Sequence, residues 1–97
     1  MDIKRVEFTL EKSEIVNSRI NVQKLRGIFP SAGKDHEFTV HTDDGDKITY
    51  IREDGRQVDH FHLGTWFGKR SGPELIGKLA IEVVKPMEEY TLKIISI

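Results

Sequence analysis

The chain has 97 residues, 15 basic and 16 acidic side chains, and no cysteine. This length suits one hydrophobic core, so we expect a single domain over residues 1–97, and the lack of cysteine excludes a disulfide framework, a thiolate metal site and a thiol nucleophile. Because the sequence contains neither a membrane-spanning apolar run nor the apolar core of a signal peptide, we expect a soluble, cytoplasmic protein.

Extended segments dominate the chain. Val6, Phe8 and Leu10 alternate with polar residues, which is the period of a half-buried strand, and a polar arm follows them. Ile20 and Val22 begin a second, shorter strand. We expect further strands over residues 37–41, 47–52, 57–63, 79–84 and 90–95, and short helical segments over residues 25–29 and 64–68.

The clearest local signal is a hairpin. Phe38 and Val40 alternate with polar residues, and residues 43–46 (Asp-Asp-Gly-Asp) form a tight turn, because glycine adopts positive φ without strain and aspartate tolerates it. About seven strands with one or two short helices predict a mainly β domain, either a small barrel or a sandwich.

Charge is distributed unevenly. Residues 12–34 carry five basic side chains against one acid, Glu14, a local charge near +4. Residues 35–59 carry eight acids against three bases. Such asymmetry is typical of a basic face opposite an acidic one, although chance is an equally simple explanation in a small domain.

The ordered pieces resemble a known family, the B3-type DNA-binding pseudobarrel of plant transcription factors and of restriction endonuclease recognition domains. The matching residues are Phe8-Thr9-Leu10, Lys12-Ser13-Glu14-Ile15, Arg19 to Lys24, Ile28-Phe29-Pro30, the hairpin turn at Asp43 to Gly45, Gly64-Thr65-Trp66-Phe67, and Leu75 to Ile81. Gly77-Lys78 and Gln23 depart from the family's Gly-Asp turn and helix-initiating proline. The resemblance implies a seven-stranded open pseudobarrel with one or two short helices.

The resemblance also implies two arms that enter the DNA major groove. One lies around residues 13–24, and the other lies between the strand that ends near Arg52 and the strand over residues 58–63. Base readout is expected from Asn17, Arg19, Arg56 and Gln57, since Arg pairs with guanine and Asn or Gln with adenine. Arg52 and His60 belong to the second arm. Phosphate contacts are expected from Lys12, Ser18, Lys24, Lys69 and Arg70. The simpler alternative is an ordinary turn at Asn17-Ser18 with solvated arginines. For His60, a structural role without DNA contact is favoured.

Other chemistry is poorly supported. His60 and His62 at i, i+2 on a strand suggest a metal, but nothing fixes a third ligand. Nuclease catalysis needs clustered acids with a lysine. Of the available residues, Asp43 and Asp44 lie in the hairpin turn, and Glu82 and Lys85 have the wrong spacing for the usual acid-x-Lys pair. Trp66 and Phe67 are expected in the core. We therefore expect no catalytic residue, no metal and no cofactor.

The partners expected are double-stranded DNA and a nuclease domain or subunit, without a membrane. The alternative function is a small β-barrel protein-interaction module whose acidic hairpin binds a basic partner.

Overall fold

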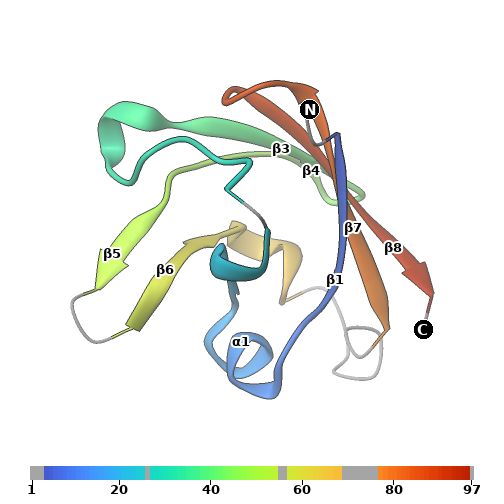
Figure 1. Ribbon diagram of the computed structural model, residues 1–97. Coiled ribbons are helices and arrows are strands. Elements are labelled where there is room, and N and C mark those ends of the chain that lie inside the picture. The colour runs from blue at the N-terminus through green and yellow to red at the C-terminus, as the bar shows by residue number, and fades with distance from the viewer. Residues whose placement is uncertain (1–3, 26, 55–56, 69–76, 97) are drawn as a thin grey trace.

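A computed structural model describes residues 4–25, 27–54, 57–68 and 77–96. Two β-sheets enclose one hydrophobic core (Figure 1). The larger sheet has the strand order β1 (Arg5–Thr9), β7 (Lys78–Lys85), β8 (Glu89–Ser96), β3 (Phe38–Thr42), β4 (Gly45–Thr49). The smaller sheet has the order β2 (Arg19–Asn21), β6 (Gln57–His62), β5 (Arg52–Asp54). One α-helix, α1 (Lys12–Asn17), and three 3-10 turns, η1 (Gln23–Leu25), η2 (Lys34–His36) and η3 (Gly64–Trp66), complete the described elements.

The expectation of a mainly β domain is confirmed, and the two sheets are not closed into a barrel. The described residues form eight strands rather than about seven, because the strand expected over residues 47–52 is divided. β4 ends at Thr49, the chain crosses at Tyr50-Ile51, and β5 begins in the other sheet. Within the described ranges no helix is long and apolar enough to span a membrane.

Two helical expectations were wrong. Residues 12–17, expected as part of a polar loop, form α1, and the helical turn expected over residues 25–29 lies earlier, at Gln23–Leu25. α1 forms because the Glu14 carboxylate, at the third helical position, accepts a hydrogen bond from the Glu11 N–H at 2.8 Å. This bond satisfies a helix-terminal donor that otherwise has no partner within the helix.

The β3–β4 hairpin is confirmed, with Thr42 opposite Gly45 across a two-residue turn. The turn is attached to η3: the Trp66 indole N–H donates to Asp43 at 3.1 Å, and the Thr65 hydroxyl donates to Asp44 at 2.6 Å. Lys47 donates to the same Asp44 oxygen at 2.8 Å. Trp66 and its neighbour Phe67 are buried, as expected. The turn aspartates thus hold the Trp66 segment in place.

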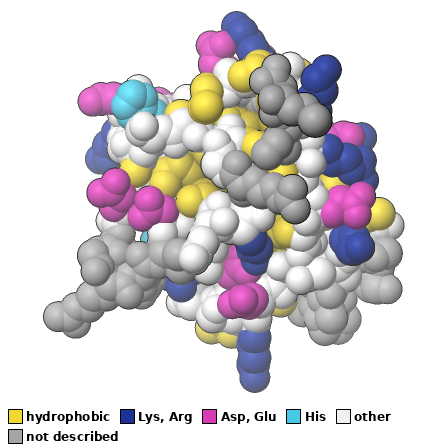
Figure 2. Space-filling model, viewed as in Figure 1, with side chains coloured by type: hydrophobic (Ala, Val, Ile, Leu, Met, Phe, Trp, Pro, Cys, Tyr) yellow, Lys and Arg dark blue, Asp and Glu magenta, His cyan; other side chains and the backbone are white. Residues whose placement is uncertain are grey.

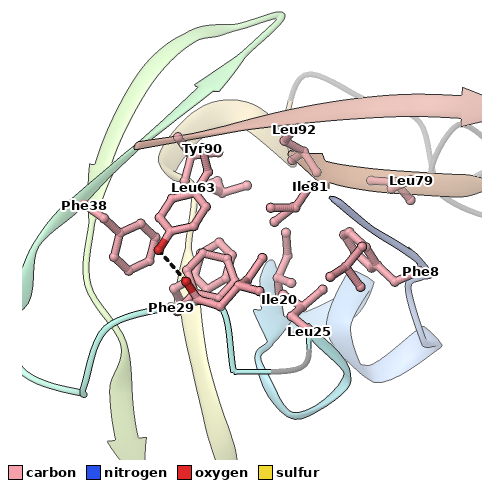
Figure 3. Close-up of a cluster of buried hydrophobic side chains, with 14 of the residues drawn as sticks. Phe8, Ile20, Leu25, Phe29, Phe38, Leu63, Leu79, Ile81, Tyr90 and Leu92 are labelled. Atoms are coloured by element: carbon pink, nitrogen blue, oxygen red, sulfur yellow. Dashed lines mark hydrogen bonds between the residues drawn. The ribbon is translucent and has the colours of Figure 1, made fainter. Parts of the chain in front are cut away.

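Four aromatic rings connect the two sheets at the centre of the core (Figure 3). Phe29 lies within 4.5–5.0 Å, centroid to centroid, of Phe38 in β3, Phe61 in β6 and Tyr90 in β8. The Tyr90 hydroxyl donates to the buried Ile28 carbonyl at 2.7 Å (Figure 3). Burial of the ring raises the pKa of Tyr90 to about 12. The segment that precedes Pro30 is therefore held by both packing and a buried hydrogen bond.

We expect Tyr90→Phe to lower the free energy of unfolding by about 1–2 kcal/mol, because it leaves the buried Ile28 carbonyl without its donor. Tyr50→Phe is the matched control, since Tyr50 is only partly buried. Urea denaturation measures both variants, and equal midpoints for Tyr90→Phe and the wild type would contradict this role.

His41 joins three strands of the larger sheet. Its Nδ1 lies 2.7 Å from Asp46 in β4, and its Nε2 lies 2.9 Å from Glu89 in β8. Both ring nitrogens donate to carboxylates only when the imidazole is protonated. The hydrogen bond with Glu89, followed by that with Asp46, raises the pKa of His41 above its ordinary value of 6.5.

Because the folded state raises this pKa, the stabilisation by His41 is complete below pH 6.5 and is lost as the pH rises through the folded-state pKa. We expect the denaturation midpoint to fall over that window, and His41→Gln to remove the His41 part of the fall. His36→Gln, an exposed histidine of η2, should keep the wild-type slope. An unchanged slope in His41→Gln would show that these ion pairs do not couple to folding.

Candidate nucleic-acid interface

The first arm is organised around a buried carboxylate. Glu14 is fully buried, and besides the Glu11 N–H it accepts a hydrogen bond from the Asn21 N–H at 2.8 Å. The Lys24 ammonium also pairs with Glu14 and donates to the Thr9 carbonyl at 2.8 Å. Three donors from α1, β2 and η1 therefore converge on one side chain, and the lysine adds a link to the end of β1.

This pairing alters the expected charge of the arm. Lys24 was expected to contact phosphate, but its ammonium already faces Glu14, and its side chain is only 27% exposed. Glu14, counted in the sequence as one acid of an exposed arm, is the least exposed charged residue described. The pair cancels one positive and one negative charge, so the remaining described cations of residues 12–34 are Lys12, Arg19 and Lys34.

The tip of the arm is attached to β6. Ser18 ends α1 in the left-handed conformation (φ 53°, ψ 47°), which is uncommon for a residue other than glycine and turns the chain sharply into β2. The Ser18 carbonyl lies 3.0 Å from His62 Nδ1. The arm that begins at α1 is thus held against the strand that leads away from the second arm.

One face of the smaller sheet carries polar side chains from all three strands. Ile20 of β2 lies opposite Phe61 of β6, and both side chains are fully buried. Since side chains alternate along a strand, their neighbours point to the other face. We call this the polar face; its residues are Arg19, Asn21, Arg52, His60 and His62.

The register places these residues in two rows. Arg19 lies opposite His62, while Asn21 and Arg52 both lie opposite His60, one from each side. The His60 and His62 rings are 5.1 Å apart and nearly perpendicular. The guanidinium carbon of Arg52 lies 4.9 Å from the centroid of the Tyr50 ring, a cation–π arrangement that limits where this exposed arginine points.

A hollow of about 750 Å³ lies on the polar face beside the segment that precedes η2. The charged and titratable residues that line it are Lys34, Arg52, Glu53, His60 and His62. Two fixed cations and two histidines against one carboxylate make the hollow favourable for an anion. Figure 2 shows basic and acidic side chains interspersed over the face in view.

The structure brings together only some of the residues expected to bind DNA. Arg19, Arg52 and His60 share the polar face. Lys12 and Asn17 lie on α1 rather than on the sheet, and the Asn17 side-chain amide donates to the Ser13 carbonyl at 2.8 Å. The remaining expected residues are Gln57, which begins β6 but whose side chain is not described, and Arg56, Lys69 and Arg70, which lie outside the described residues.

Four residues of this surface were not expected from the sequence. His62 was placed on the same strand face as His60 but was considered only as a metal ligand. Asn21 alternates with Ile20 and Val22, so the two-residue period places it on the polar side of its strand. Lys34 and Tyr50 reach the hollow from other segments, and no local pattern in the sequence indicates that these two residues lie there.

The rival chemistries gain no support from the described residues. No three His, Asp or Glu side chains within the described ranges gather as metal ligands do. Of the acids considered for a nuclease, Glu82 pairs with Arg5 and Lys93, and Asp43 and Asp44 hold the η3 segment. The hairpin acids are therefore engaged internally, which leaves them less suited to a basic partner.

Comparison of the chain with protein-family models, with curated proteins and with solved structures finds no match.

We expect Glu14→Gln to lower the free energy of unfolding by about 2–4 kcal/mol, because the amide turns an N–H donor towards other donors and leaves Lys24 without its counter-charge. Glu7→Gln is the control, since Glu7 forms only exposed ion pairs and should change stability by less than about 0.5 kcal/mol. Equal midpoints for the two variants in urea would refute a structural role for Glu14.

Proposed function

We propose that this chain is a non-catalytic domain that binds double-stranded DNA in the major groove through the polar face and the two arms beside it. The observation that carries the proposal is the joining of both arms: β2 from the first and β5 from the second flank β6 in one sheet. Arg, Asn and His side chains are thereby brought to one face, on which Arg52 is exposed, Arg19, Asn21 and His62 are partly buried and His60 is buried. Arg, Asn and His are residue types that hydrogen-bond to base edges and phosphates.

The charge distribution supports this proposal. The chain has a net charge of −1, so an overall positive field does not draw it to DNA. Lys34, Arg52 and Arg19 lie at or near the polar face, where phosphate binding needs them. The nearly balanced overall charge limits sequence-independent binding and favours recognition through a few oriented side chains.

We further propose that the two sheets are a B3-like open pseudobarrel and that the chain serves a restriction-type nuclease held in another domain or subunit. The order of elements supports the assignment: a strand, a polar arm, Phe29-Pro30, a hairpin, and a strand that enters the Gly64–Trp66 turn. In this proposal Arg56, Gln57, Lys69 and Arg70 remain predicted DNA contacts.

We expect binding to short duplex DNA to weaken with salt, with a log–log slope of about −0.9 for each phosphate neutralised. Fluorescence anisotropy with a labelled duplex, from about 50 to 200 mM salt, measures the slope. A slope near zero, or no binding at the lowest salt, would contradict the proposed DNA binding.

In the same titration, Arg52→Ala should weaken binding several-fold. A slope about one unit shallower identifies a phosphate contact, and an unchanged slope with relaxed sequence preference identifies a base contact. Arg5→Ala is the matched control, because it removes the same charge from the larger sheet, where Arg5 pairs with Glu7 and Glu82. Equal losses in the two variants would place the interface elsewhere.

A further inference from the structure

His62 has one tautomer imposed on it by the first arm. Its Nδ1 lies 3.0 Å from the Ser18 carbonyl oxygen, and a carbonyl oxygen can only accept a hydrogen bond. The proton of the neutral imidazole must therefore be on Nδ1. Nε2 is consequently an acceptor, and it becomes a donor only when the ring gains a second proton.

The orientation of the ring is fixed as well. The Ser18 contact holds one edge, and the perpendicular His60 ring lies 5.1 Å away. His62 lines the hollow, and its Nε2 has no hydrogen-bond partner within the described residues. An acceptor of known tautomer is thus held at the surface proposed for DNA.

The groups that face His62 come from every neighbouring element. Arg19 of β2 lies opposite it, and His60 precedes it on the same face of β6. Arg52 and Glu53 from β5 and Lys34 from η2 share the hollow with it. The cations cannot accept hydrogen bonds and His60 is buried, so among these groups a base amino donor finds its acceptors in His62 Nε2 and Glu53.

We propose that His62 is a base-reading residue whose preference inverts on protonation; this rests on the DNA-binding function proposed above. In the major groove the amino groups of cytosine and adenine are donors, whereas guanine presents only acceptors, O6 and N7. Neutral His62 accepts at Nε2 and selects an amino base. Protonated His62 donates there and selects guanine. Adenine offers both kinds of group, so a change from cytosine to guanine is the diagnostic one.

Selection of bound duplexes from a random pool, at about pH 8 and about pH 5, tests this inference, since histidine changes charge between these values. We expect cytosine or adenine at one position at the higher pH. At the lower pH, competition between duplexes that differ only there should favour guanine about fivefold to tenfold. Other positions should keep their preference.

His62→Gln should abolish the inversion while other positions are still read, because an amide donates and accepts at both pH values. His36→Gln, an exposed histidine outside the hollow, should keep it. The role of His62 is overturned if the inversion persists in His62→Gln, or if the wild type has the same preference at the two pH values. Either result leaves the DNA-binding function standing.

If His62→Gln does not fold, as judged by circular dichroism, the wild-type selections at the two pH values decide the question. If the wild type enriches no sequence at either pH, that result instead overturns the DNA-binding function itself.

Discussion

The carboxylate of Glu14 joins segments that are otherwise separate in the fold. It accepts from α1, from the end of β2 and from Lys24 in η1, and the lysine extends the link to Thr9 at the end of β1. A buried charge is tolerated only when it is paired and hydrogen-bonded, and Glu14 meets both conditions. Ile15 also packs against the core and the Ser18 carbonyl contacts His62, and together with these contacts Glu14 fixes the position of Ser18 and Arg19.

The proposed interface depends on these contacts. Ser18 turns the chain into β2 and supplies the carbonyl that orients His62, so one left-handed residue connects the arm to the central strand of the polar face. The side chains that would touch DNA are thus carried on paired strands. A rigid sheet positions such groups more accurately than free loops do.

Local patterns predicted much of the fold. The hairpin turn at Asp43-Asp44 follows from residues adjacent in sequence, and the alternation of Val6 and Phe8 gave β1 its buried face. The α1 helix was missed although part of its signal is local, since Glu11 and Glu14 form a capping box three residues apart. Its other contacts come from Asn21 and Lys24, seven and ten residues after Glu14, and no local pattern indicates them. Lys24 was assigned to phosphate for the same reason, since a lysine in a basic stretch gives no sign of a buried partner.

The sequence by itself determined the mainly β character, the hairpin and the burial of Trp66, because strand periodicity, turn chemistry and aromatic burial act over a few residues. The tertiary structure alone decided that β2, β5 and β6 form one sheet, that Glu14 is buried, and that Lys34 and Tyr50 share a hollow with the two histidines. These features depend on contacts between residues far apart in the chain. No local pattern encodes them, because they form only when the two sheets close over the common core.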